Sequence, residues 1–203
     1  MDVDSTLITA EVIELLAAHA GSRAQVEAIT DRAMRGEIDF ATSLHERVAT
    51  LAGLSVGVLD DVRAELELTP GARELLTELH RRDWPVGLVS GGFAEVVEPL
   101  AASLGITRTR ANRLEVADGR LTGRVRGAVV DRAAKEAALR EYAAAEGIDL
   151  AHTIAIGDGA NDLAMLAAAG FSVAFNAKPL VRQAADVAVD GRLDAVLELI
   201  DNA

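Results

Sequence analysis

The sequence predicts an α/β protein with a Rossmann-like, three-layer core around a parallel sheet, an inserted helical bundle and a small β-hairpin. Two observations support this prediction. After residue 70, short apolar runs alternate with helical segments, as expected for buried parallel strands joined by helices. Between residues 10 and 69, apolar residues recur at intervals of three and four, which is the spacing of amphipathic helices.

Composition narrows the class of protein. A chain of 203 residues can form one globular unit with a sizeable core. Hydrophobic residues make up 50% but aromatic residues only 3%, so Ala, Val, Leu and Ile must build that core. The net charge of -12 argues against a nucleic-acid partner, although local basic groups and a metal would still permit a small anionic substrate.

The absence of cysteine excludes disulfides and a thiolate nucleophile. No apolar run approaches the roughly 18 residues of a membrane span. The first residues are acidic, where a signal peptide would be basic. We therefore expect a cytoplasmic protein with no membrane partner, and the sequence does not predict its oligomeric state.

The insertion, residues 10–69, is predicted to contain four helices that end near glycines. The helices are expected over residues 11–20, 26–35, 40–51 and 58–67. Asp39 is the expected N-cap of the third helix. Thr69-Pro70-Gly71 marks the return to the core.

The core is predicted to comprise residues 1–9 and 70–203. Its strands are expected over residues 86–89, 153–156, 172–175 and 187–189. Its helices are expected over residues 72–81, 93–104, 131–145, 163–169 and 193–200, with a further helix opening at Pro179. Asp118-Gly119 is a strong turn signal, so residues 112–127 are predicted to form a hairpin flap outside the sheet core.

Polar residues collect where the predicted strands end, and ligands of parallel sheets bind at that edge. They are Asp2, Asp4, Ser90, Gly91, Asp158, Asn161 and Asp162. Two crowded carboxylates such as Asp2 and Asp4 require a cation, a shared proton or separate roles. Carboxylates with few accessible nitrogen or sulfur ligands favour a hard cation such as Mg²⁺, and Lys135 can supply positive charge for a phosphoryl group.

These motifs together resemble the four motifs of the haloacid dehalogenase superfamily, and nearly the whole chain resembles the phosphoserine phosphatases within it. The resemblance extends to Glu11, Met34, residues 39–48 and Asn176-Ala177-Lys178-Pro179. It implies that Asp2 is the nucleophile of an aspartyl-phosphate mechanism and that Asp4 is the general acid and base. It also implies a Mg²⁺ ion held by Asp2, Asp158 and the backbone carbonyl of Asp4.

The same resemblance assigns the substrate contacts. Ser90, Gly91, Lys135 and Asn161 would hold the phosphoryl group, and Asp162 would support the metal site or orient Lys135. Residues 10–69 would form a cap over the site. In that cap, Arg47 would bind the substrate carboxylate, Glu11 its ammonium group, and Met34 with Phe40 would pack around its short side chain.

The implied function is Mg²⁺-dependent hydrolysis of O-phospho-L-serine to L-serine and phosphate, a step of serine biosynthesis. One alternative is a related small-molecule phosphatase or a phosphotransferase, for example one that passes phosphate to homoserine. A second is a non-catalytic phosphoacceptor module, against which Asp4 argues, because an acid and base beside the nucleophile promotes turnover.

The position of Asp2 raises one further expectation. An aspartyl-phosphate enzyme of this kind requires a buried strand before the nucleophile, and here only Met1 precedes Asp2. We expect either that the true start lies upstream or that the central strand is incomplete. Asp2 would then lie beside a charged, mobile terminus.

Overall fold

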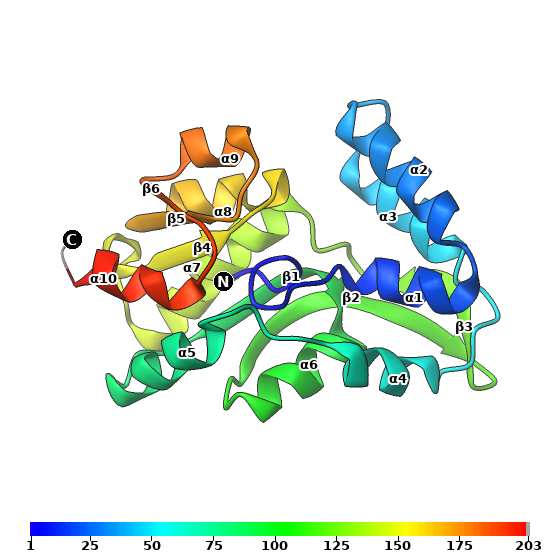
Figure 1. The fold of residues 1–203 in the computed structure, drawn as a ribbon, viewed down its shortest axis with the longest axis horizontal. Coiled ribbons are helices and arrows are strands. Elements are labelled where there is room, and N and C mark those ends of the chain that lie inside the picture. Colours follow the sequence, from blue (N-terminus) through cyan, green and yellow to red (C-terminus); the bar gives the residue numbers. More distant parts are fainter. Residues whose placement is uncertain (202–203) are drawn as a thin grey trace.

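The structure, a computed structural model, describes residues 1–201 and contains two three-stranded sheets flanked by helices (Figure 1). One sheet has the order β1-β2-β3 and comprises Gly87–Phe93, Arg108–Ala117 and Arg120–Arg126. The other has the order β4-β5-β6 and comprises Ile154–Gly157, Phe171–Phe175 and Val187–Val189. All pairings in the second sheet, and the β1–β2 pairing, are parallel, as the alternation of apolar runs and helices predicted.

The hairpin differs from its prediction as a flap outside the sheet core. Strand β2 first pairs with β1 in parallel, with Leu88 opposite Thr109, and then continues to pair with β3 antiparallel. The hairpin is therefore an extension of the core sheet. The turn signal located its tip, where Asp118 and Gly119 both have positive φ, but residues 108–111 do not form a clear apolar run and were not predicted as strand.

The first two residues bridge the two sheets. The amino group of Met1 donates to the carbonyl of Gly87 at 2.9 Å, and the Val89 amide donates to the carbonyl of Met1 at 3.0 Å. On the other side, the Asp2 amide donates to the carbonyl of Ile156 at 2.9 Å. Met1 and Asp2 therefore lie between β1 and β4 and are hydrogen-bonded to both strands.

The expectation that Asp2 lies beside a mobile terminus is wrong. Its backbone is held from β4, and the residue is only 4% exposed. Burial lowers the pKa of the Met1 amino group to about 6, partly offset by the charge of Asp2. After Val3 the chain turns, and the amides of Leu7 and Ile8 both donate to the Val3 carbonyl.

An apolar cavity of about 420 Å³ adjoins Met1. Its lining includes Val89 of β1, Ile156 of β4 and Tyr142 of helix α7 (Arg132–Glu146). None of Asp2, Asp4 and Asp158 lines it, so this cavity is separate from the carboxylates described below.

Four helices form between residues 10 and 69, as predicted. They are α1 (Val12–Ala20), α2 (Arg23–Met34), α3 (Phe40–Ala49) and α4 (Val58–Glu65). Asp39 is confirmed as the N-cap of α3, since its carboxylate accepts the Thr42 amide at 2.7 Å. In Figure 1, α2 and α3 lie on one side of the N-terminal segment, and α8 (Leu163–Ala168) and α9 (Pro179–Ala184) lie on the other.

The remaining helices flank the sheets. They are α5 (Ala72–Arg81), α6 (Ala94–Ser103), α7 (Arg132–Glu146) and α10 (Val196–Ile200), with 3₁₀ turns at Leu150–His152, Ala160–Asp162 and Leu193–Ala195. Asp131 caps α7 by accepting the Ala134 amide at 2.9 Å. This cap fixes the start of the helix that carries Lys135.

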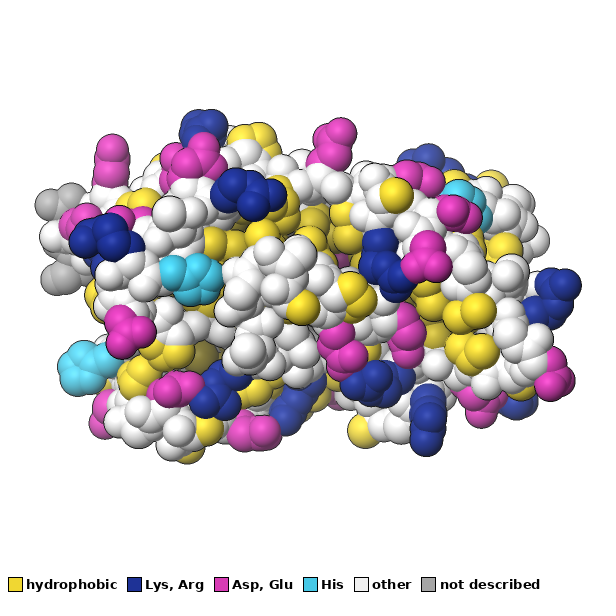
Figure 2. Space-filling model, turned by 90° about the horizontal axis from the view of Figure 1, so that it is seen from below, with side chains coloured by type: hydrophobic (Ala, Val, Ile, Leu, Met, Phe, Trp, Pro, Cys, Tyr) yellow, Lys and Arg dark blue, Asp and Glu magenta, His cyan; other side chains and the backbone are white. Residues whose placement is uncertain are grey.

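Charged side chains of both signs are interspersed on the face seen in Figure 2. Many are paired within the chain, for example Arg82 with Asp201 at 2.5 Å. None of the helices within residues 1–201 has the length and apolar character needed to cross a membrane.

Candidate active site

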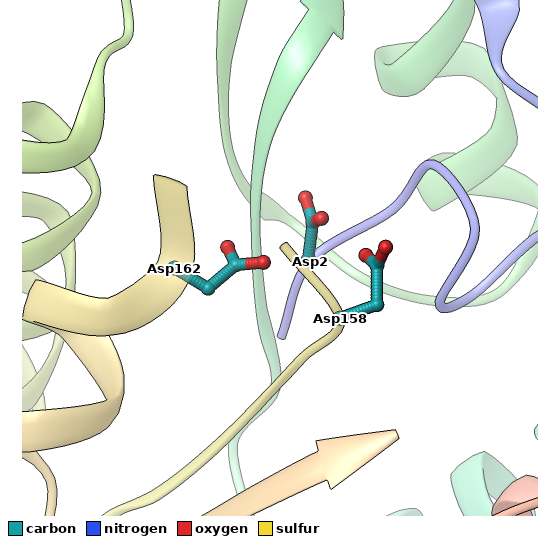
Figure 3. Close-up of side chains that lie close together, drawn as sticks. All are labelled: Asp2, Asp158 and Asp162. Carbon is teal, nitrogen blue, oxygen red and sulfur yellow. The ribbon is translucent and has the colours of Figure 1, made fainter. Parts of the chain in front are cut away.

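Three aspartates from two segments of the chain meet at one point, as Figure 3 shows. Asp2 comes from the bridge between the sheets, Asp158 follows β4, and Asp162 closes the 3₁₀ turn after it. One carboxylate oxygen from each lies within 4.8 Å of the others. Such a set of hard oxygen donors fits a divalent cation.

Lys135 compensates the charge of this cluster. It projects from α7, is fully buried, and its Nζ donates to Asp2 at 2.7 Å and to Asp162 at 2.6 Å. Burial alone would lower the pKa of Lys135, but the two carboxylates outweigh burial and raise it, so the side chain remains an ammonium ion.

Two of the three carboxyl groups, those of Asp2 and Asp158, have raised pKa values. Burial and the charge of Asp162 raise the pKa of Asp2 to about 8, against the opposing effect of Lys135. Burial and Asp162 likewise raise the pKa of Asp158 to about 6. The hydroxyl of Thr6 donates to Asp158 at 3.1 Å and partly offsets this shift.

Asp4 lies in a different environment. Its Oδ1 is buried and has no hydrogen-bond partner among residues 1–201. Burial, followed by the charges of Glu11 and Asp2, raises the pKa of Asp4 well above its usual value, which favours the protonated acid. Gly92 leaves space for this carboxylate, because a Cβ there would lie 2.7 Å from Asp4 Oδ2.

Ser90 and Gly91 lie inside β1 and not beyond its end, where the sequence placed them. The strand continues to Phe93, with an irregular register between Val89 and Phe93 that the two glycines permit. A Cβ on Gly91 would lie 3.1 Å from the Phe40 ring and 3.7 Å from Nδ2 of Asn161. Strand β1, helix α3 and the turn after β4 therefore converge at Gly91.

Glu11 and Arg47 lie on the helical side of the site. The Ser5 hydroxyl donates to Glu11 Oε1 at 2.6 Å, from a residue with φ of 57°. Arg47 is partly buried and donates only to the Ser43 carbonyl, at 3.3 Å, with no ion-pair partner among the residues that the structure describes. Burial lowers its pKa, while the charges of Glu11 and Asp4 oppose this shift.

Met34 is placed differently from the other predicted substrate contacts. It is the last residue of α2, is 60% exposed, and its Sδ lies 3.8 Å from Nζ of Lys178. The structure gives it no contact with the carboxylates.

Two contacts near the site were not predicted from the sequence: the Ser5 hydroxyl donates to Glu11, and the Thr6 hydroxyl donates to Asp158. Their position directly after the aspartate pair was the available signal.

A family model for haloacid dehalogenase-like hydrolases matches residues 1–167. The chain belongs to this family. The chain is 60% identical over 201 residues to a phosphoserine phosphatase of Streptomyces coelicolor, a match that covers 98% of this chain and 49% of the relative. It is 52% identical over 202 residues to a phosphoserine phosphatase of Streptococcus thermophilus, covering 99% and 94%. The chain thus spans about half the length of the first relative and nearly all of the second.

Solved structures agree with these relatives. The chain superposes with a TM-score of 0.92 on a structure described as a phospho-aspartyl intermediate analogue of phosphoserine phosphatase, at 40% identity, covering 98% of this chain and 95% of the other. The resemblance predicted from the four motifs is therefore confirmed.

Proposed function

We propose that this hydrolase converts O-phospho-L-serine to L-serine and phosphate through an aspartyl phosphate on Asp2. The observation that supports this substrate best is the partly buried guanidinium of Arg47, which has no acidic partner of its own within the described residues and lies in the field of Glu11 and Asp4. Glu11 and Arg47 both interact electrostatically with Asp4, so a carboxylate for an ammonium group and a cation for a carboxylate lie near the proposed acid and base. The names of the relatives support the same substrate.

In the first step, a carboxylate oxygen of Asp2 attacks phosphorus and the bond from phosphorus to the serine oxygen breaks. Asp4, kept protonated by its surroundings, gives its proton to the departing serine oxygen. In the second step, water attacks phosphorus and Asp4 takes the proton of that water. The bond from phosphorus to Asp2 breaks, which releases phosphate and restores both carboxyl groups.

The phosphoryl oxygens are held by four groups around the nucleophile: the Ser90 hydroxyl, the Gly91 backbone, the Lys135 ammonium and the Asn161 amide. Lys135 already contacts Asp2 at 2.7 Å, and Asn161 and Gly91 are neighbours. The compensation of charge by preorganised donors is the main contribution that a protein makes to phosphoryl transfer.

Asp2, Asp158 and the backbone carbonyl of Asp4 would hold a Mg²⁺ ion, which when bound would neutralise negative charge on the phosphoryl group. The all-carboxylate cluster and the raised pKa values of Asp2 and Asp158 support this assignment. Asp162 lies near the same point, but its ion pair with Lys135 at 2.6 Å favours the orientation of that lysine as its role.

We expect the affinity for Mg²⁺ to increase with pH. Metal ligands must be deprotonated, and the pKa values of Asp2 and Asp158 are raised to about 8 and about 6. The apparent Mg²⁺ affinity should therefore rise from pH 6 to pH 8, with about one proton released per ion near pH 7. Titration calorimetry in buffers of different ionisation enthalpy measures this release. A proton count near zero, or an affinity that falls with pH, would contradict the assignment.

Helices α1 to α4 form the proposed cap, residues 10–69, which closes over the core of residues 1–9 and 70–203. The approach of Phe40 to Gly91 and the contact of Met34 with Lys178 support this division. In the cap, Arg47 binds the substrate carboxylate and Glu11 the ammonium group. Met34 would be a contact at the rim, given its exposure.

Arg47→Ala is expected to raise KM for O-phospho-L-serine about 100-fold, because an ionic contact to the substrate carboxylate is worth roughly 2 to 5 kcal/mol. The hydrolysis of p-nitrophenyl phosphate, which lacks that carboxylate, should change little. Steady-state kinetics on both esters tests whether only the hydrolysis of O-phospho-L-serine is impaired. Arg63→Ala is the control, since Arg63 donates to the Glu95 carbonyl elsewhere on the surface. Equal losses on both esters would argue against the proposed substrate.

A phosphotransferase would differ in its acceptor. When homoserine is added to the same assay, the proposed phosphatase releases inorganic phosphate without forming phosphohomoserine. Accumulation of phosphohomoserine would favour the phosphotransferase instead.

A further inference from the structure

Asn112 lies in β2, outside the four motifs, yet both ends of its amide are used. Nδ2 donates to the Gly91 carbonyl at 2.8 Å, and Oδ1 accepts the Val130 amide at 2.8 Å. The residue is 1% exposed. A buried amide that satisfies both a donor and an acceptor holds the two segments it joins in a fixed relation.

The first of these segments is the part of β1 that is proposed to bind the phosphoryl group. The peptide from Gly91 to Gly92 is planar and trans, so fixing its carbonyl also fixes the direction of the Gly92 amide. That amide donates to Ser90 Oγ at 2.8 Å. The Ser90 hydroxyl thereby accepts a hydrogen bond from the backbone and keeps its own hydrogen for a ligand oxygen. Since two successive glycines restrain this peptide weakly, an external anchor is needed.

The second segment leads into α7. Val130 immediately precedes Asp131, the N-cap of the helix that carries Lys135. The Asn112 side chain thus links the strand that carries the Ser90 hydroxyl to the start of the helix that carries the Lys135 ammonium group. Ser90 and Lys135 are two of the groups proposed to hold the phosphoryl oxygens.

We propose that Asn112 is a positioning residue that sets the phosphate affinity of the site by orienting the Gly91–Gly92 peptide and aligning it with α7. This inference rests on the proposed function for the identity of the substrate, but not for the binding of inorganic phosphate. Asn112 does not touch the ligand and acts through Ser90 and Gly91.

Asn112→Asp tests this role with the smallest change of shape. The carboxylate can still accept the Val130 amide, but it presents an oxygen to the Gly91 carbonyl where the amide donated. We expect the dissociation constant of inorganic phosphate, measured by calorimetry with Mg²⁺ present, to rise about tenfold. KM for O-phospho-L-serine should rise by a similar factor, with a smaller change in kcat.

The matched control is Ser172→Ala. Ser172 is also buried and joins two segments, since its hydroxyl donates to Asp186 at 2.7 Å and accepts the Asp186 amide at 3.0 Å. It should lose stability while keeping the parental phosphate affinity. If Asn112→Asp does not fold, Asn112→Ser replaces it, with an expected rise of about threefold, because water can partly replace the amide.

A folded Asn112 variant with the parental phosphate constant would overturn this inference. So would a loss of affinity in Ser172→Ala equal to that in the Asn112 variant, because the effect would then be general destabilisation. Weakened phosphate binding in a protein that does not hydrolyse O-phospho-L-serine would leave this inference intact and reject the proposed function.

Discussion

Asp2→Asn is expected to lower kcat for O-phospho-L-serine by about 10⁴-fold or more, on the scale found when a catalytic nucleophile is removed. An amide cannot form the acyl phosphate that the mechanism requires. The shape of the side chain is kept, and the amide oxygen can still accept the bond that Lys135 Nζ donates at 2.7 Å, so the fold should persist. Steady-state phosphate release with Mg²⁺ measures the loss.

The control for Asp2→Asn is Asp190→Asn. Asp190 is exposed and pairs with Arg182 at 2.6 Å, far along the chain from the carboxylate cluster. It should retain parental turnover. Substantial activity in Asp2→Asn, beyond what deamidation to Asp explains by mass spectrometry, would remove Asp2 as the nucleophile.

Lys135→Met is expected to cost roughly 3 to 5 kcal/mol of unfolding free energy, because removing one partner of a buried ion pair leaves the other charges uncompensated. Here two carboxylates, Asp2 and Asp162, lose the same cation. Turnover should also fall about 10³-fold, since the phosphoryl group loses a donor. Urea unfolding and steady-state kinetics measure the two losses.

The loss of unfolding free energy in Lys135→Met should increase with pH. Without the ammonium, the raised pKa of Asp2 moves further up, and a carboxyl with a raised folded-state pKa stabilises less as pH increases. The stability deficit of Lys135→Met should therefore widen as pH rises through about 8, the pKa of Asp2 in the parent. Lys178→Met, an exposed lysine substitution, should show no such trend. A deficit that narrows with pH would contradict the charge-compensation role of Lys135.

Much of this fold could be predicted because its elements have clear periodicity. The helices of residues 10–69 follow from apolar residues three and four apart, and Asp39 as an N-cap from its position before Phe40. The meeting of Asp2 and Asp158 could be anticipated because the ends of parallel strands share an edge. The roles of these residues came from the resemblance to a family and not from periodicity.

Other features depend on contacts that the local sequence does not encode. Strand β1 continues past Ser90 to Phe93 because Phe93 pairs with Asn112 of β2. In the sequence alone, the two glycines after Ser90 indicate the end of a strand. The bridge at Met1 and Asp2 exists only because β1 and β4 offer backbone partners on both sides. The two bonds of Asn112 join positions 21 and 18 residues away, beyond any local pattern.

The central claim is that O-phospho-L-serine phosphorylates Asp2 transiently. Rapid acid quench of the enzyme with radiolabelled O-phospho-L-serine, followed by peptide mass spectrometry, tests it most directly. We predict phosphate on Asp2 that forms and decays within the turnover time, and that accumulates in Asp4→Asn because the base for the second step is lost. Label on another residue, no covalent label in either protein, or a phosphorylated state that lasts minutes in the parent would contradict the mechanism.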